Sequence, residues 1–235
     1  MQPGTCDIDD RTKEQYEVTF QIALIGQDGL VVASDRLGVH ATPSETGGPI
    51  FSQASSQIKY CISDDQSVFC FWAGGAMSPV VARQIALSCK PQHSELQWFN
   101  LIQTVAQGIP LPYQHPVDQI IVVRADTPNA VFIVTRRMDT VSSMKMRDTI
   151  CTGVSTVAQF FPRHLWHSGM PISELKTLAL LTLSYATEEN PSSVGPPFDI
   201  MTLDHAGRVT WSVHDPIHQT FQVDLERLVL KHQIA

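Results

Sequence analysis

The chain has 235 residues, of which 43% are hydrophobic and 17% charged, which is typical of a globular protein and not of a disordered one. This length predicts one domain, or two at most. The formal net charge is −7 and the 16 Lys and Arg residues are scattered, so the basic stripe that nucleic-acid binding requires is missing from the sequence. We therefore expect no nucleic-acid partner.

The sequence also argues against a membrane or secreted protein. Its longest apolar runs, such as TLALLTL at 177–183, are far shorter than the ~20 residues that span a bilayer. The amino terminus has no basic segment followed by an apolar one, as a secretory signal would have. Five cysteines, without any C-x-x-C spacing, indicate reduced thiols and not a disulfide framework or a zinc site. We expect a cytoplasmic protein without a membrane partner.

In chain order, the first elements predict a leader followed by a β-hairpin. Residues 1–17 are polar and acidic, and we interpret them as an N-terminal extension or propeptide-like leader before a single domain, 18–235. Apolar residues alternate over 17–26, which predicts a strand. An Asp-Gly pair then predicts a tight turn into a second strand, 30–35. The segment 37–56 is rich in Pro, Gly and Ser and predicts a long loop.

The remaining elements are strands and pairs of helices. The predicted elements are a hairpin (57–63 and 67–75), helices 78–89 and 94–108, strands 118–124, 130–136 and 140–150, helices 155–168 and 172–189, strands 198–203 and 208–213, and a closing amphipathic helix, 216–232. Ser78 is predicted to cap the first helix, with Pro79 in its first turn. This order favours an α+β fold in layers. A four-layer αββα sandwich, with two mostly antiparallel sheets between helix layers, uses every element.

Five motifs follow one another along the chain. The first, at 19–36, has the form T-x-x-x-A-x-x-x-x-DGLVVASDR. The others are QIKYCISDD (57–65), AGG (73–75), GVSTVA (153–158) and YATEENPSSVG (185–195). Together they resemble the proteasome β-subunit branch of the N-terminal nucleophile (Ntn) hydrolases, over nearly the whole chain from residue 18. The resemblance implies the αββα sandwich, a homo-oligomeric ring, a peptide substrate and an unfoldase partner.

The resemblance also implies the chemistry of the site. A threonine hydroxyl attacks with its own α-amine as the base, a carboxylate and a lysine tune that amine and hydroxyl, and a glycine N–H stabilises the oxyanion. Thr19 lies at the nucleophile position and Asp35, sixteen residues later, at that of the first acidic partner. The lysine position falls on Lys59 or, without an insertion, on Gln57. Gly74 is the oxyanion candidate, with the next glycine as the alternative.

Three further positions complete the predicted site. Ser155 matches a serine that the family places beside the nucleophile, and it is also a candidate N-cap for the helix that follows. The second acidic partner of the family falls on Asn190, with Ser193 in the expected place. Asparagine carries no charge and cannot stabilise a protonated amine electrostatically. Glu189 is the neighbouring carboxylate that could replace it. Two histidine pairs in the sequence have no third ligand placed by spacing, so we expect no metal and no cofactor.

Two departures concern the nitrogen of Thr19. Eighteen residues precede it in the sequence, and while they remain its nitrogen is an amide without a basic lone pair. The residue before it is Val18, whose stiff β-branched side chain shields the carbonyl that self-cleavage must attack. A Gly4–Thr5 junction followed by Cys6 is at the wrong distance from an acidic strand residue, and we attribute it to chance.

Three functions are therefore open at this stage. The first is a catalytically silent subunit of a proteasome-like ring that retains its leader. The second is a threonine-type endopeptidase or amidohydrolase that becomes active when residues 1–18 are removed. The third is a peptide or small-molecule binding module on the same fold, because a fold alone does not determine function.

Overall fold

A computed structural model describes residues 19–43, 49–54, 56–75, 77–109, 117–126, 130–137, 140–153 and 158–215. The predicted leader and the predicted closing helix, 216–232, lie outside these residues. Within the described ranges, none of the helices combines the length and the apolarity that a membrane crossing requires.

Most strands of the described chain form two five-stranded antiparallel sheets. The first has the order β10-β1-β2-β11-β12 and consists of β1 (Phe20–Ile25), β2 (Gly29–Asp35), β10 (Thr149–Gly153), β11 (Phe198–Asp204) and β12 (Val209–His214). The second has the order β5-β6-β7-β8-β9 and consists of β5 (Tyr60–Ile62), β6 (Val68–Ala73), β7 (Val117–Arg124), β8 (Ala130–Arg137) and β9 (Thr140–Met146).

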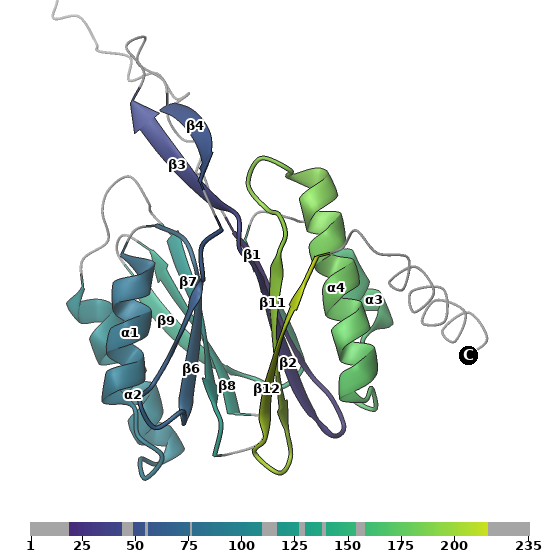
Figure 1. The fold of residues 1–235 in the computed structure, drawn as a ribbon. Helices are drawn as coiled ribbons and strands as arrows, with labels where there is room; N and C mark the ends of the chain where they lie inside the picture. The colour runs from purple at the N-terminus through teal and green to yellow at the C-terminus, as the bar shows by residue number, and fades with distance from the viewer. Residues whose placement is uncertain are drawn as a thin grey trace, which may run out of the picture.

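The helices cover the outer faces of the two sheets (Figure 1). They are α1 (Ser78–Ser88), α2 (Glu95–Gly108), α3 (Phe160–Leu165) and α4 (Ile172–Glu189). One hydrophobic core lies between the first sheet and α3 and α4, a second between the second sheet and α1 and α2, and a third between the two sheets. The predicted four-layer αββα sandwich is thereby confirmed.

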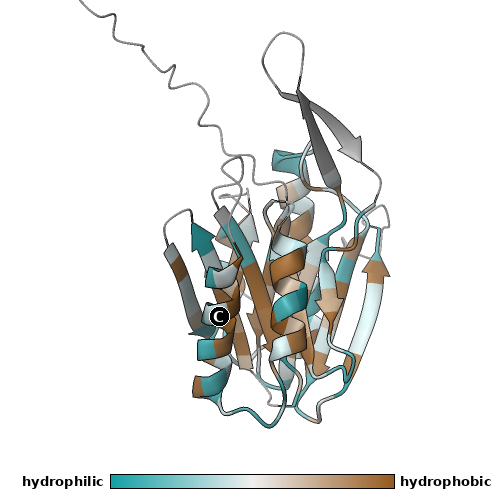
Figure 2. Ribbon diagram, turned by 90° about the vertical axis from the view of Figure 1, so that its left-hand side faces the viewer, coloured by the Kyte–Doolittle hydropathy of each residue, from teal (hydrophilic) through white to brown (hydrophobic). Residues whose placement is uncertain are grey.

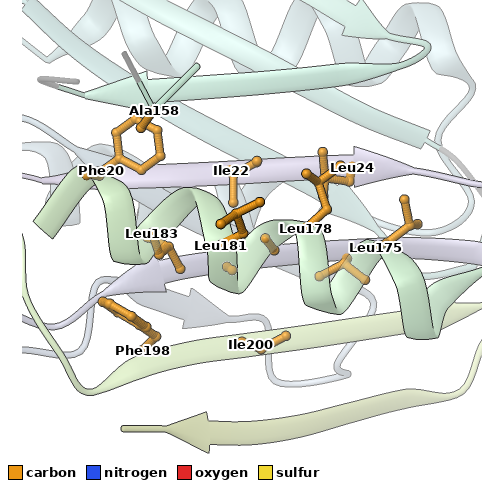
Figure 3. Packing of buried hydrophobic residues seen from close by; sticks show 14 of the residues in the cluster. Phe20, Ile22, Leu24, Ala158, Leu175, Leu178, Leu181, Leu183, Phe198 and Ile200 are labelled. Atoms are coloured by element: carbon orange, nitrogen blue, oxygen red, sulfur yellow. The ribbon is translucent and has the colours of Figure 1, made fainter. Parts of the chain in front are cut away.

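Strand β1 illustrates how the sequence builds these layers. Phe20, Ile22 and Leu24 are fully buried and face α4 (Figure 3), whereas Ala23 and Ile25 point into the core between the sheets. Because side chains alternate along a strand, an apolar residue at nearly every position requires cover on both faces. Burying each large apolar side chain contributes about 1.5–3 kcal/mol, so the strand is stable only inside the sandwich.

In the layer of α1 and α2, helix α2 begins at a recognisable capping motif. In Figure 2 hydrophobic stretches run along the strands behind these helices, and both hydrophobic and hydrophilic residues lie on the helices. The side chain of Ser94 caps α2 by accepting a hydrogen bond from the Gln97 N–H at 3.3 Å, and the Gln97 side chain accepts from the Ser94 N–H at 2.7 Å. This reciprocal capping box satisfies two backbone donors at the helix start.

Two predictions about strands were wrong. The segment 37–56, predicted as a loop, contains an antiparallel hairpin of β3 (Gly38–Pro43) and β4 (Pro49–Ala54) that projects beyond the sandwich (Figure 1). Backbone hydrogen bonds can pair these strands without the alternation of apolar and polar residues by which a strand is predicted from sequence. The segment 140–150, predicted as one strand, divides between β9 and β10, which belong to different sheets. A continuous strand-like pattern cannot reveal that the chain changes sheet.

Two predictions about helix starts also needed correction. The N-cap of α1 is Met77, and Ser78 is already helical, with no capping bond from its side chain. Pro79 does lie in the first turn, as predicted. The helix predicted at 155–168 is a short α3 that starts at Phe160 among the described residues and ends before Trp166.

The tight turn between β5 and β6 contains an exposed carboxylate with an unusual pKa. Asp65 accepts hydrogen bonds from the hydroxyls of Ser63 and Ser67, each at 2.6 Å, and from the Ser67 N–H at 3.1 Å. These bonds favour the ionised form and lower the pKa of Asp65 to about 2. A lowered folded-state pKa means that this turn contributes stability above the unfolded pKa of ~4 and loses it as the pH falls toward 2.

We predict that Ser63→Ala raises the pKa of Asp65 toward its ordinary value, because the first of these donors is removed. An NMR titration of the Asp65 carboxyl measures the shift directly. Asp204, whose pKa is lowered by hydrogen bonds from Arg208 and Ala206 in a different turn, supplies the control, and Ser63→Ala is expected to leave its titration unchanged. An unchanged Asp65 titration in the variant would contradict the assignment of the Ser63 bond.

Candidate active site

The candidate site is centred on a buried ion pair between the two sheets. Asp35 ends β2 and is fully buried, and Lys59 directly precedes β5 in the other sheet and is 4% exposed. The Lys59 Nζ lies 2.9 Å from Oδ1 and 2.8 Å from Oδ2 of Asp35, and it also donates to the Leu37 carbonyl at 2.6 Å. The pair therefore ties the first sheet to the second at the end of β2.

Three backbone N–H groups complete the surroundings of the Asp35 carboxylate. The Phe20 N–H donates to Oδ1 at 3.0 Å, while those of Leu37 and Gly195 donate to Oδ2 at 3.1 and 3.5 Å. The first bond places the peptide unit between Thr19 and Phe20 directly against the carboxylate. Thr19 itself is 4% exposed. The predicted nucleophile and its predicted acidic partner are thus brought together.

The electrostatics of the pair follow from its burial. Burial lowers the pKa of Lys59, and the negative charge of Asp35 opposes that shift. Burial likewise raises the pKa of Asp35, against the charge and hydrogen bonds of Lys59 and the N–H donors. Both shifts bring the charged and neutral forms of Lys59 and Asp35 closer in free energy. Removing a proton from the Lys59 amine therefore costs less than it does in water.

The surroundings of Asp35 distinguish Lys59 from Gln57. The side chain of Gln57 packs over Gly38, where an added Cβ would lie 2.6 Å from its Cδ, and the residue is exposed. Its N–H donates to the Arg36 carbonyl at 2.7 Å. Only Lys59 of the two contacts the Asp35 carboxylate, which favours it over Gln57 for the predicted lysine position. Its catalytic role stays a prediction.

The two glycines after β6 differ in what their N–H groups face. The Gly75 N–H donates to Asp118 Oδ1 at 3.0 Å and is therefore engaged inside the protein. Gly74 has a φ of +138°, and an added Cβ would lie 2.9 Å from the Ser78 Oγ and overlap the Asp118 carboxylate. N–H groups alternate in direction along a strand. Because the Trp72 N–H donates toward β5, to the Lys59 carbonyl, that of Gly74 points to the same side.

Gly74 is consequently the better oxyanion candidate, and Asp118 is a residue that sequence reasoning missed. Asp118 is fully buried and pairs with the guanidinium of Arg136, 1% exposed, at 3.2 Å. Arg136 also donates to the Ile109 carbonyl. The two charges stand opposite each other in β7 and β8. The available signal was an acid and an arginine near the ends of two strands whose central residues are apolar.

Strand β10 closes the site on the side of Thr19. Gly153 pairs with Phe20, has a φ of +109°, and approaches so closely that an added Cβ would overlap the Thr19 carbonyl oxygen. Its N–H donates to the Gln119 side chain at 3.3 Å. Only glycine fits this position, because it needs both a positive φ and an absent side chain. Ser155, predicted nearby, lies outside the described residues.

Asn190 and Ser193 form the turn that follows α4. Asn190 is the C-cap, and its carbonyl accepts from the N–H of Ser193 and of Val194, both at 2.9 Å. The turn leads to Gly195, whose N–H reaches Asp35 and whose carbonyl accepts from the Arg36 N–H at 3.3 Å. The segment is therefore attached to the end of β2. The roles of the Asn190 and Ser193 side chains stay predictions.

Solved structures place this arrangement in a known fold. Anbu (ancestral beta-subunit) from Yersinia bercovieri matches with a TM-score of 0.65 and 13% sequence identity, over 91% of this chain and 94% of that one. Anbu from Hyphomicrobium sp. strain MC1 matches with a TM-score of 0.62 and 13% identity, over 92% and 95%. The chain has the Ntn-hydrolase fold. The predicted resemblance to proteasome β-subunits is confirmed as a likeness of fold.

This identity of 13% carries the Ntn-hydrolase fold and not the activity. No protein-family model matches the sequence, and no curated protein matches it either. Among the described residues, no group of three or more His, Cys, Asp and Glu side chains is placed to hold a metal ion.

Proposed function

We propose that the protein is a proteasome β-like subunit of a homo-oligomeric ring, catalytically silent while residues 1–18 precede Thr19. The observation that carries this proposal is the state of Thr19. Its side chain and backbone are 4% exposed, and its nitrogen forms the peptide bond to Val18. An amide nitrogen cannot accept the proton of the hydroxyl, so the base that this class of nucleophile needs is missing.

A second candidate function is supported by the residues around Thr19. Asp35 and Lys59 form a paired, buried acid and amine beside it, and the Gly74 N–H points to the β5 side of β6, where Lys59 lies. A buried ion pair is costly to keep, and a stability role alone is served as well by apolar residues. The alternative is therefore a threonine-type peptidase or amidohydrolase whose amine is released by cleavage before Thr19.

Assembly into a ring is supported by apolar side chains on the outer helices. Large exposed apolar residues occur in both helix layers of the described chain: Val80 and Leu87 on α1, Leu96 on α2, Phe160 on α3 and Tyr185 on α4, with 39–69% of their surface exposed. Such side chains on opposite faces of one molecule suit a head-to-tail contact, and head-to-tail contacts that close form rings.

The test is the intact mass of the assembled protein together with amino-terminal sequencing. We expect a ring whose chains still begin before Thr19 and which does not hydrolyse fluorogenic peptide amides. A variant with a foreign protease site directly before Thr19 then provides the amine on demand. Its matched control carries the same site and Thr19→Ala.

Each outcome decides between the two candidates. Retained residues 1–18 and no hydrolysis, in the ring as purified, support the silent subunit. A purified chain that begins at Thr19 and hydrolyses peptides, with activity lost in the Thr19→Ala control, would establish the peptidase and overturn our proposal. Hydrolysis only after cutting the engineered site would mean a competent site that is kept silent by its leader, in agreement with the proposal. A monomer would contradict the ring.

A further inference from the structure

A pair of cysteine thiols lies outside the site, on the face of the second sheet that α1 covers. Cys61 in β5 and Cys70 in β6 are directly opposite each other in the antiparallel register, so both side chains point to the same face. Cys70 belongs to the hydrophobic core under α1 and α2, and Cys61 packs against it. Cys70 is fully buried and Cys61 is partly exposed, and both are free thiols in the structure.

The backbone hydrogen bonds between β5 and β6 determine whether Cys61 and Cys70 form a hydrogen-bonded or a non-hydrogen-bonded pair. The Trp72 N–H donates to the Lys59 carbonyl at 3.1 Å, and the Ser63 N–H donates to the Val68 carbonyl at 2.9 Å. Because hydrogen-bonded and non-hydrogen-bonded pairs alternate, Cys61 and Cys70 form a hydrogen-bonded pair between these two. The Cα atoms of such a pair are about 5.5 Å apart, which is within the range that a disulfide bridges.

The two thiols differ in reactivity. The Cys70 thiol donates a hydrogen bond to the Cys61 sulfur and so lowers the pKa of Cys61, and the nearby Arg83 guanidinium on α1 lowers it further. Burial raises the pKa of Cys70 well above its usual value. The partly exposed sulfur thus has more thiolate character, and the buried one keeps its proton. Cys61 therefore has the properties of a reactive thiol, and Cys70 those of a resolving thiol.

We propose that Cys61 and Cys70 are a peroxide-sensitive thiol pair that closes to a disulfide between β5 and β6. The Cys61 thiolate attacks one oxygen of a hydroperoxide, the O–O bond breaks, and the departing oxygen leaves as hydroxide or alkoxide. This step oxidises Cys61 to a sulfenic acid. The Cys70 sulfur then attacks the Cys61 sulfur, the S–O bond breaks, and the released hydroxide takes the Cys70 proton to form water.

The position of the pair connects this modification to the candidate site. A disulfide brings the two Cβ atoms to about 3.8 Å, closer than in most hydrogen-bonded strand pairs. Strand β5 must therefore move toward β6 when the bond forms. Lys59, the counter-ion of Asp35, lies two residues before Cys61 and is hydrogen-bonded to β6 through its own carbonyl. The modification acts on the strand that positions this lysine.

The test is mass spectrometry of the full-length protein after exposure to hydrogen peroxide, followed by alkylation and peptide mapping. We expect a loss of about 2 Da, reversed by dithiothreitol, and, after digestion with a protease that cleaves at Asp64 or Asp65, a single linked peptide pair containing Cys61 and Cys70. Cys61→Ser is expected to abolish this loss. In Cys70→Ala the Cys61 sulfenic acid has no resolving thiol, and dimedone is expected to label it.

Cys89 supplies the matched control. It lies in the same core, but burial raises its pKa to about 12, so Cys89→Ser is expected to leave disulfide formation unchanged. A wild-type protein that loses no mass, or an equal loss in Cys61→Ser, would overturn the proposal. So would a mapped bridge from Cys61 to Cys89. Circular dichroism of each variant, compared with the wild type, establishes that the fold is retained.

Discussion

Lys59→Met is expected to lower the free energy of unfolding by about 3–5 kcal/mol, because it leaves a buried carboxylate without its counter-ion. Asp35 is fully buried and receives both short bonds from the Lys59 amine. The remaining N–H donors do not supply a compensating charge. Urea unfolding of the purified variant and of the wild-type protein measures the difference.

The matched control is Lys145→Met, which removes a lysine from an exposed pair. Lys145 and Glu95 lie 2.6 Å apart, with side chains 36% and 57% exposed, and such pairs contribute about 0–1 kcal/mol. A double variant, Asp35→Leu with Lys59→Met, is expected to recover much of the loss, since no charge is then left buried. Equal losses in the two single lysine variants would refute the buried ion pair as an energetic unit.

Gly74→Ala is expected to destabilise the protein and to disable any oxyanion stabilisation. Its φ of +138° is a conformation that L side chains adopt only under strain, of order 1–3 kcal/mol. The added methyl group also meets the Asp118 carboxylate, which positions the Gly75 N–H. If the chain cut before Thr19 hydrolyses peptides, losing this donor geometry is expected to lower kcat by about 10²–10³. Unfolding curves and kcat together measure both effects.

Gly108→Ala provides the control, because Gly108 ends α2 in open space, with no atom within 4 Å of an added Cβ. There the substitution is expected to be neutral or to stabilise by less than about 1 kcal/mol, through the unfolded state. A Gly74→Ala protein as stable and as active as Gly108→Ala would remove Gly74 from the proposed site.

The sequence alone predicted the elements whose signals are local. The alternation in β1, the Asp-Gly turn and the run into β2 all lie within one short stretch, so the β-hairpin followed directly. The spacing from Thr19 to Asp35 was interpretable for the same reason. In a tight hairpin the register follows from the turn, and it brings the start of β1 beside the end of β2.

Only the tertiary structure revealed the contacts between residues that are far apart in the sequence. Whether Lys59 or Gln57 reaches Asp35 depends on how β5 lies against β2 in another sheet, and the sequence patterns of both residues are equivalent. The contacts of Asp118 with Gly75 and Arg136 form only when folding brings β7, β8 and the glycine turn together. The division of 140–150 between two sheets had the same origin.

Local periodicity determined the order of strands and helices and hence the layered αββα class, because one face of each element must be buried whatever its partner is. It also placed Thr19, Asp35 and the glycines after β6 on recognisable elements. Only the folded chain decided which side chains share the buried space between the sheets. The reason is that an ion pair or a donated N–H exists only where two segments, far apart in sequence, exclude water from the same point.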